Sequence, residues 1–185
     1  MASYDLAIVG GGVGGAALGT VMARAGYSVL LLEQSEVYED RVRGEWIAPW
    51  GVAETKSVGL YDLLLAAGGH HLARHVTYDE SREAEVSEAR TLPLNIFAAG
   101  VPGPLCLGHP LHCQTLFDAA ARAGAETHRG IDVTTIQLGD QPQVSFTLDN
   151  GDKRVALARL VVGADGRNSM VRETCGVPLH ADKPH

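Results

Sequence analysis

The residues near the N-terminus that could do chemistry are glycines and one acid. Gly10, Gly12 and Gly15 follow the pattern G-x-G-x-x-G, and Glu33 comes about 20 residues later, as such sites require. In this pattern the first glycine makes a tight turn, the second lets a pyrophosphate approach the backbone, and the third lets a helix lie close to a strand. Free N–H groups at the start of that helix hold the phosphate charge. A carboxylate at position 33 can accept hydrogen bonds from both ribose hydroxyls, so the segment predicts a dinucleotide site.

A second group of candidate residues surrounds Asp165. An apolar run at 160–162 leads into it, and small residues occupy positions 163, 164 and 166. The run predicts a buried strand, which puts Asp165 at the carboxyl end of the strand, where open α/β sheets bind ligands. The small neighbours permit a close approach of the backbone, and we interpret the segment as a second ligand contact.

Two arginines and two tryptophans lie in the long connection that follows Glu33. Arg41 and Arg43 are candidates to contact phosphate or ribityl oxygens of a bound dinucleotide, with solvent-facing charges as the alternative. Trp46 and Trp50 form either part of a pocket wall or an ordinary aromatic core. Long connections without periodicity are usually functional or mobile.

Histidines and cysteines suggest metal ligands, but their spacing argues against a metal site. His71 and His75 lie in a segment that alternates like a strand, where four residues span roughly 13 Å, although both can face a substrate cavity. The set Cys106, His109, His112 and Cys113 matches no familiar zinc finger. We therefore expect no metal, and we expect Cys113 to be a small buried apolar residue.

The elements that position these residues alternate between strand and helix, which predicts an α/β fold. The expected elements are a strand at 6–9, a helix to Arg24, a strand at 29–32, a helix at 52–67, a strand at 71–78, a helix at 111–123 that ends at Gly124, strands at 125–138 (bent at Gly130), 144–148 and 155–157, a strand at 160–162 and a helix from 169. The segment 149–151 (Asp-Asn-Gly) predicts a hairpin turn. Segment 91–107 is broken by prolines and forms an irregular strand pair or a loop over a pocket.

Length and composition restrict the class of protein. The chain has 185 residues and a net charge of −7, so it has no electrostatic footprint for nucleic acid or an anionic membrane. The dense acidic run at 79–90 is interpreted as a solvated strand pair or loop rather than a partner site. Three cysteines form a sparse, odd set typical of a reducing compartment, and the apolar start is too short for a signal or a membrane span. We expect a soluble, cytoplasmic protein.

Taken together, the motifs resemble a known family. The glycine pattern with Glu33, the segment RVRGE at 41–45 and the segment VVGADGRNSMVR at 161–172 are similar to flavoprotein monooxygenases of the para-hydroxybenzoate hydroxylase type. The resemblance implies FAD as the cofactor, in a Rossmann-like FAD/NAD(P)-binding βαβ domain with an inserted β-rich substrate-side portion at about 70–105. The cofactor-binding residues that it implies are Gly10, Gly12, Val13, Gly14, Gly15, Glu33, Gln34, Arg43, His109, Val133, Asp165 and Gly166.

The resemblance also implies an activity. In such enzymes NAD(P)H reduces the flavin, O2 adds to give a C4a-hydroperoxide, and an aromatic or polyketide-like small molecule is hydroxylated, while the protein positions the cofactor. No side chain of this chain is assigned as a catalytic acid or base. The alternatives are a related halogenase or reductase, or a nucleotide-binding fragment that is inert alone.

Members of this family are longer and carry a third, Gly-Asp motif in a later segment. We therefore expect residues 1–185 to be the N-terminal portion of the FAD-binding domain. The C-terminal half would be supplied in cis or as a second polypeptide.

Overall fold

The computed structural model describes residues 1–40 and 45–180. The chain divides into two compact units, one made of residues 1–39 and 116–185 and the other of residues 40–115. We call them the sheet unit and the middle unit and describe each by itself.

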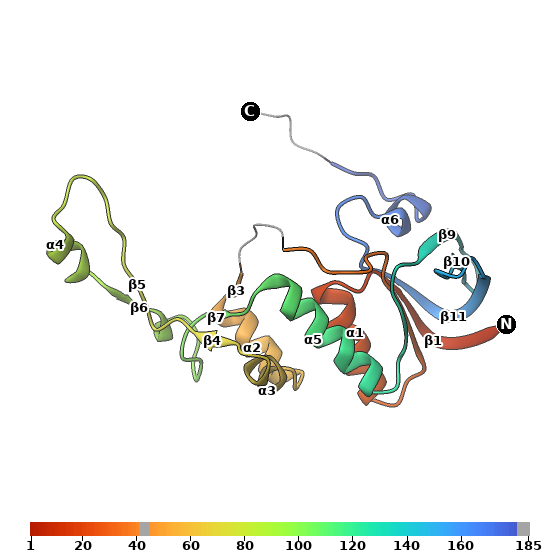
Figure 1. Ribbon diagram of the computed structural model, residues 1–185, viewed down its shortest axis with the longest axis horizontal. Coiled ribbons are helices and arrows are strands. Elements are labelled where there is room, and N and C mark those ends of the chain that lie inside the picture. Colours follow the sequence, from red (N-terminus) through yellow and green to blue (C-terminus); the bar gives the residue numbers. More distant parts are fainter. Residues whose placement is uncertain (41–44, 181–185) are drawn as a thin grey trace. The chain divides into compact units, whose positions relative to one another are not determined.

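The sheet unit is built on six strands in the order β8-β2-β1-β11-β10-β9. Figure 1 labels β1, β11, β10 and β9 of this sheet. Its elements are β1 (Ala2–Val9), α1 (Val13–Arg24), β2 (Val29–Leu32), β8 (Glu126–His128), β9 (Asp132–Gln137), β10 (Gln143–Thr147), β11 (Lys153–Gly163) and α6 (Met170–Thr174). The strands β8, β2, β1 and β11 run parallel to one another, whereas β10 pairs antiparallel with both of its neighbours, β11 and β9. The predicted α/β class and the βαβ unit at the N-terminus are confirmed.

The strands β1 and β2 are buried on both faces within this unit. On one face Ile8 and Leu31 lie at Gly19 of α1, beside Ala120 of α5 (His109–Arg122), whose residues from 116 onward belong to the sheet unit. On the other face Ala7, Val9, Leu30 and Leu32 join one buried cluster with residues of β9, β10, β11 and α6. Because parallel strands are buried on both faces, β2 reads as a continuous apolar run.

Three strand predictions at the C-terminal side need correction. The expected strands at 155–157 and 160–162 are one strand, β11, which pairs antiparallel with β10 at residues 153–157 and parallel with β1 at residues 156–163. The expected strand at 125–138 is two strands, β8 and β9, which lie at opposite edges of the sheet. Local periodicity cannot reveal such pairings, because the partners are distant in sequence.

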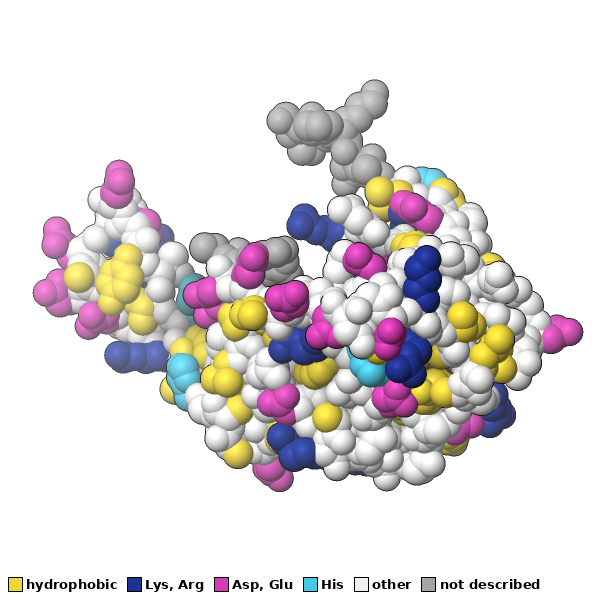
Figure 2. Space-filling model, turned by 45° about the vertical axis from the view of Figure 1, so that its right-hand side comes forward, with side chains coloured by type: hydrophobic (Ala, Val, Ile, Leu, Met, Phe, Trp, Pro, Cys, Tyr) yellow, Lys and Arg dark blue, Asp and Glu magenta, His cyan; other side chains and the backbone are white. Residues whose placement is uncertain are grey.

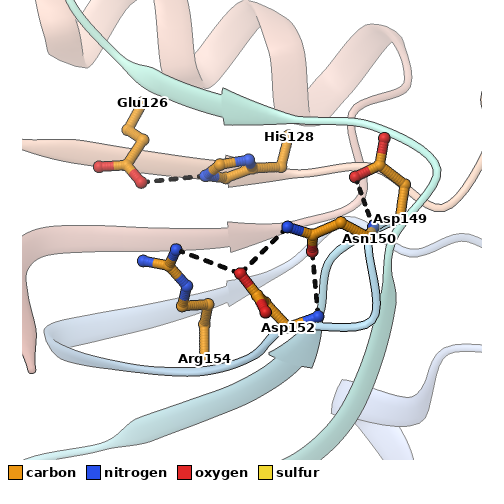
Figure 3. Close-up of polar contacts among 6 residues, drawn as sticks. All are labelled: Glu126, His128, Asp149, Asn150, Asp152 and Arg154. Carbon is orange, nitrogen blue, oxygen red and sulfur yellow. Dashed lines mark hydrogen bonds and ion pairs between the residues drawn. The ribbon is translucent and has the colours of Figure 1, made fainter.

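The hairpin turn between β10 and β11 is confirmed, and side chains stabilise it (Figure 3). The Asn150 amide donates to Asp152 Oδ2 at 3.0 Å, and the Asp152 backbone N–H donates to Asn150 Oδ1 at 3.0 Å. Asp149 Oδ1 accepts from the Asn150 N–H at 2.9 Å. Gly151 has φ +84°, the left-handed conformation for which glycine is suited.

The middle unit consists of short elements joined by turns. They are β3 (Trp46–Ile47), α2 (Pro49–Ser57), α3 (Tyr61–Ala66), β4 (His70–His71), β5 (Arg74–His75), α4 (Ala84–Glu88), β6 (Leu92–Pro93), a 3-10 turn η1 (Leu94–Ile96), β7 (Leu105–Cys106) and the first residues of α5. The strands form the sheets β3-β7-β4 and β5-β6. The single helix expected at 52–67 is wrong, because Gly59 (φ +69°) ends α2 and a new helix starts at Tyr61.

Several expectations for the middle unit can be compared with its strands and with the exposure of its side chains. The strand expected at 71–78 is reduced to two separate two-residue strands. The acidic run is solvated as expected, and Figure 2 shows acidic side chains gathered on the segment around α4. The expected strand pair or loop is wrong at residues 84–88, which form the helix α4. Trp46 is 52% exposed and Trp50 65%, so the alternative that they form an aromatic core is wrong. No helix within residues 1–40 and 45–180 is both long and apolar enough to cross a membrane.

Candidate dinucleotide-binding site

Three parallel strands of the sheet unit end together beside the glycine loop. In the strand register Val9 of β1 pairs with Leu32 of β2 on one side and with Gly163 of β11 on the other. The loop at 10–12, Glu33 and Asp165 therefore follow neighbouring strand ends. The strand β2 lies on one side of β1 and β11 on the other, so the strand order reverses at β1. The carboxyl ends of these strands therefore form the topological switch point, where such sheets bind ligands.

Gly10 and Gly15 are required by packing within the protein. Gly10 has φ +104°, and a Cβ on it would lie 2.2 Å from the Ala164 carbonyl oxygen. A Cβ on Gly15 would lie 1.9 Å from the Gly10 carbonyl oxygen. The tight turn at Gly10 and the close approach of the helix at Gly15 are confirmed.

Gly12 and Gly14 differ, because the described residues leave space around them. A Cβ on either residue would meet nothing within 4 Å. Gly12 is the N-cap residue of α1 and has no side-chain cap, and α1 runs for 12 residues from Val13. The first N–H groups of such a helix have no partner in the helix and favour an anion. The residues present thus fit a pyrophosphate held against Gly12, Val13 and Gly14.

Glu33 is buried at the end of β2, with 9% of its surface exposed. Its Oε2 accepts from the Gly11 N–H at 2.6 Å, and its Oε1 accepts from the Ser35 N–H at 2.8 Å. Two backbone donors therefore hold the carboxylate in place. Each carboxylate oxygen has a further lone pair, so hydroxyl groups of a ribose can still be accepted.

The segment around Asp165 packs against the glycine loop. A Cβ added to Gly10 would lie only 2.6 Å from the Asp165 backbone nitrogen. The Asp165 carboxylate accepts from Ser169 Oγ at 2.5 Å and from the Val171 N–H at 3.2 Å, so it stabilises the start of α6. Ser169 Oγ in turn accepts from the Arg172 N–H at 2.9 Å and caps this helix.

The expectation that small residues here leave room for a ligand is correct for only one position. A Cβ on Gly163 would lie 2.8 Å from Val171 Cβ, and Ala164 packs against the glycine loop, so the protein itself fills these spaces. Gly166 has φ +82°, and a Cβ added to it would meet no atom of the described residues within 4 Å. It is the member of the segment that is open to a ligand.

The remaining predicted cofactor residues lie in different places. Gln34 follows Glu33 and donates to Asp132 Oδ1 at 3.3 Å, and Val133 of β9 packs against the buried cluster. Both belong to the sheet unit, whereas His109 belongs to the middle unit. Arg43, like Arg41, lies outside the described residues. The ligand contacts of all these residues stay predictions.

The middle unit has a cavity of its own. It measures about 320 Å³ and is lined by residues that include Glu45, His70, Cys106 and Leu111. Burial, and secondarily the nearby Glu45 carboxylate, raises the pKa of the Cys106 thiol, so this thiol stays protonated. On α5, Cys113 is fully buried as expected, with its Sγ 3.6 Å from His109 Nε2.

Sequence reasoning missed three residues beside the loop. The Tyr38 hydroxyl donates to the Gly11 carbonyl oxygen at 2.5 Å, and its ring packs edge-on against Phe117. The Arg129 guanidinium lies 4.1 Å from the Tyr38 ring centroid. Arg129 follows β8, the neighbour of β2, but the sequence predicted one continuous strand at 125–138, so no expected strand end marked this residue.

Parallel strands, an N-terminal βαβ unit and an open glycine loop at the switch point define a dinucleotide-binding domain of the Rossmann type. Comparison with known proteins gives the family: residues 3–185 match the model of the FAD binding domain. The chain belongs to this FAD-binding family, and its cofactor is FAD.

Relatives of the chain are named as hydroxylases and monooxygenases, which agrees with the resemblance seen in the motifs. The chain is 30% identical over 189 residues to 3-demethoxyubiquinol 3-hydroxylase of Escherichia coli, covering 96% of this chain and 45% of that protein. It is 32% identical over 183 residues to 6-methylpretetramide 4-monooxygenase of Streptomyces rimosus, covering 96% and 42%.

A solved structure agrees with these relatives. The anhydrotetracycline hydroxylase OxyS of Streptomyces rimosus matches with a TM-score of 0.79 and 26% identity, over 99% of this chain and 36% of that one. The chain thus spans less than half the length of the relatives that it matches.

Proposed function

We propose that this chain is the FAD-binding portion of an NAD(P)H-reduced monooxygenase that hydroxylates an aromatic or polyketide-like small molecule with O2. The observation that carries the proposal is the meeting of two motifs at one sheet edge, where the Gly10 turn packs against the backbone of 164–165. The glycine loop is common to many nucleotide-binding proteins, whereas the combination with the Asp-Gly segment is typical of flavin hydroxylases. The names of the relatives support the same class of reaction.

The residues of the sheet unit have separate tasks in this proposal. Backbone N–H groups at Gly12 to Gly15 hold the pyrophosphate, Glu33 and Gln34 hold the adenosine side, and Val133 meets the adenine through its backbone. Asp165 and Gly166 contact the cofactor towards its flavin end, as do Arg43 and His109. The chemistry supplied by bound FAD is hydride acceptance from NAD(P)H and activation of O2, and the protein binds, orients and excludes water.

We further propose that activity needs a C-terminal half, supplied in cis or as a second polypeptide, with residues at about 70–105 forming part of the substrate side. Support comes from the coverage of the relatives and from Leu160, an apolar residue of β11 that is 56% exposed. Residues 1–185 alone should bind FAD weakly, self-associate, and show no substrate-dependent NAD(P)H oxidation. We assign the protein to the cytoplasm, because its three cysteines form no disulfide among the described residues.

Replacement of Glu33 tests the cofactor assignment. Glu33→Ala should lower FAD affinity several-fold to about a hundredfold, because a charged hydrogen bond contributes about 1.5–3 kcal/mol. FAD fluorescence titration measures this, with Glu39→Ala, an exposed acid in the connection that follows, as the matched control. Equal FAD affinity of Glu33→Ala and wild type would remove the assignment. Hydroxylation of an aromatic substrate by residues 1–185 alone would refute the need for a second half.

A further inference from the structure

The peptide groups of Gly11 are held from both sides. Its N–H donates to Glu33 Oε2 at 2.6 Å, and its carbonyl oxygen accepts from the Tyr38 hydroxyl at 2.5 Å. The first contact lies at the end of β2 and the second comes from the connection after it. Gly11 is therefore fixed at both of its hydrogen-bonding groups, although it stands between two other glycines.

Packing adds to these hydrogen bonds. A Cβ on Gly11 would lie 2.8 Å from Glu33 Cβ and 2.8 Å from Phe117 Cε2. The side chains of Glu33 and Phe117 thus occupy the space into which a Gly11 side chain would point, and they block movement of the loop in that direction. Rotation of the peptide that joins Gly11 to Gly12 would break the Tyr38 hydrogen bond.

Tyr38 is itself held by residues of the sheet unit. The Arg129 guanidinium carbon lies 4.1 Å from the Tyr38 ring centroid and 5.5 Å from that of Phe117, a cation–π arrangement. Arg129 Nε donates to the Ser35 carbonyl oxygen at 3.1 Å, and the Ser35 N–H donates to Glu33. The contacts form a closed ring that joins the loop, the end of β2 and the end of β8.

We propose that Tyr38, supported by Arg129, is a positioning residue for the pyrophosphate of the dinucleotide. The Gly11 carbonyl belongs to the same peptide plane as the Gly12 N–H, so the Tyr38 hydroxyl fixes the direction of the first N–H at the open end of α1. A loop of three glycines otherwise has the largest backbone freedom to lose when a ligand binds. The inference rests on the proposed nucleotide site and adds residues that the glycine motif does not include.

The test measures ADP binding by isothermal titration calorimetry, because ADP carries the adenosine and pyrophosphate without the flavin. Tyr38→Phe keeps the ring under Arg129 and removes the hydroxyl. It should weaken ADP binding about threefold to tenfold, the effect of one hydrogen bond. Tyr27→Phe, on a ring that is 45% exposed elsewhere in the sheet unit, is the matched control and should bind ADP like wild type.

A purely structural role is distinguished by a second ligand. If Tyr38 acts on the pyrophosphate, Tyr38→Phe weakens ADP but leaves binding of adenosine, measured by competition, at the wild-type level. Equal losses for both ligands, or no loss for ADP, would overturn the inference. Arg129→Met should reproduce the selective loss for ADP, and wild-type ADP affinity in this variant would remove Arg129 from the proposal. Failure of the wild-type chain to bind ADP and FAD would refute the proposed function instead.

Discussion

The sheet unit and the middle unit differ in the length of their strands and in the burial of their aromatic side chains. In the sheet unit two long strands, β1 and β11, lie side by side, and the aromatic rings of Phe117 and Phe146 are 5% and 4% exposed. In the middle unit the strands have two residues each, and Trp46 and Trp50 are more than half exposed. In the sheet unit, strands distant in sequence share one core, whereas in the middle unit a few buried residues such as Leu60 and Leu64 pack between short elements.

This difference indicates at which positions a substitution should lower the stability of the protein. In the sheet unit backbone groups approach so closely that a single methyl group is too much, and yet the ligand side of the same loop is open. In the middle unit a few buried residues should carry the stability, while its aromatic surface should contribute little. Four predictions test this comparison, in order of expected effect.

The largest effect is expected for Gly15→Val, because even the Cβ would lie 1.9 Å from the Gly10 carbonyl oxygen. The free energy of unfolding should fall by more than about 3 kcal/mol, beyond ordinary overpacking. Gly12→Ala, with open space at its Cβ, should change stability by less than about 0.5 kcal/mol and still weaken ADP. Urea unfolding followed by circular dichroism measures both, and similar stabilities of the two variants would contradict the packing argument.

In the middle unit Leu64→Ala should cost about 2–5 kcal/mol, because Leu64 of α3 is fully buried and its truncation leaves a cavity. Trp50→Ala should cost less than about 0.5 kcal/mol, since the ring is 65% exposed. Thermal unfolding compares the two variants. A larger loss for Trp50 than for Leu64 would show that the aromatic surface supports the folded chain.

A smaller effect is expected for Tyr61→Phe. His71 Nδ1 lies 2.8 Å from the Gly103 carbonyl oxygen, which can only accept, so Nδ1 carries a proton, and His71 Nε2 lies in hydrogen-bond contact with the Tyr61 hydroxyl at 2.8 Å. Loss of this bond should cost about 0.5–1.5 kcal/mol. Hydrogen exchange should speed up for amides of α3 and β4, while β1 amides exchange at the wild-type rate. Tyr78→Phe, on an exposed ring, provides the control.

The smallest effect is expected for Glu126→Gln on β8. Hydrogen bonds from Tyr4 at 2.6 Å and from His128 at 2.9 Å (Figure 3 shows the latter) lower the pKa of Glu126 below its ordinary value of 4.5. A lowered pKa in the folded state stabilises the protein above pH 4.5, and this contribution is lost as the pH falls through the folded pKa. The variant should therefore be slightly less stable than wild type at neutral pH and equal to it in acid. An identical difference at both pH values, in thermal unfolding, would contradict the assignment.

Much of the sheet unit could be predicted because its signals are local. The glycine pattern, the apolar run of β2, the Asp-Asn-Gly turn and the helix that ends at Gly124 each lie within a short segment. The packing roles of Gly10 and Gly15 follow from the same pattern. These predictions are confirmed by the strand register and by the close backbone contacts.

The rest depended on partners that are far apart in sequence. Arg129 and Ser35 are 94 residues apart, so no local pattern could place Arg129 beside Tyr38. The strand β11 carries Arg159 between the apolar residues 155–158 and 160–162, and it was predicted as two strands, because the pairing with β10 and β1 that makes it continuous involves residues distant in sequence. In the middle unit a single glycine at position 59 outweighed the helical periodicity of the leucines.

The uninterrupted strand β11 has a consequence for length variation. Its 11 residues, roughly 36 Å at the rise of a strand, join the hairpin turn to the segment that packs on the glycine loop. Insertion or deletion of one residue between 153 and 163 would turn every following side chain to the opposite face. It would also move Asp165 along the sheet edge, away from Gly10. Insertions and deletions among related sequences should therefore occur at the turn of residues 149–151, and the length of the strand itself should be constant.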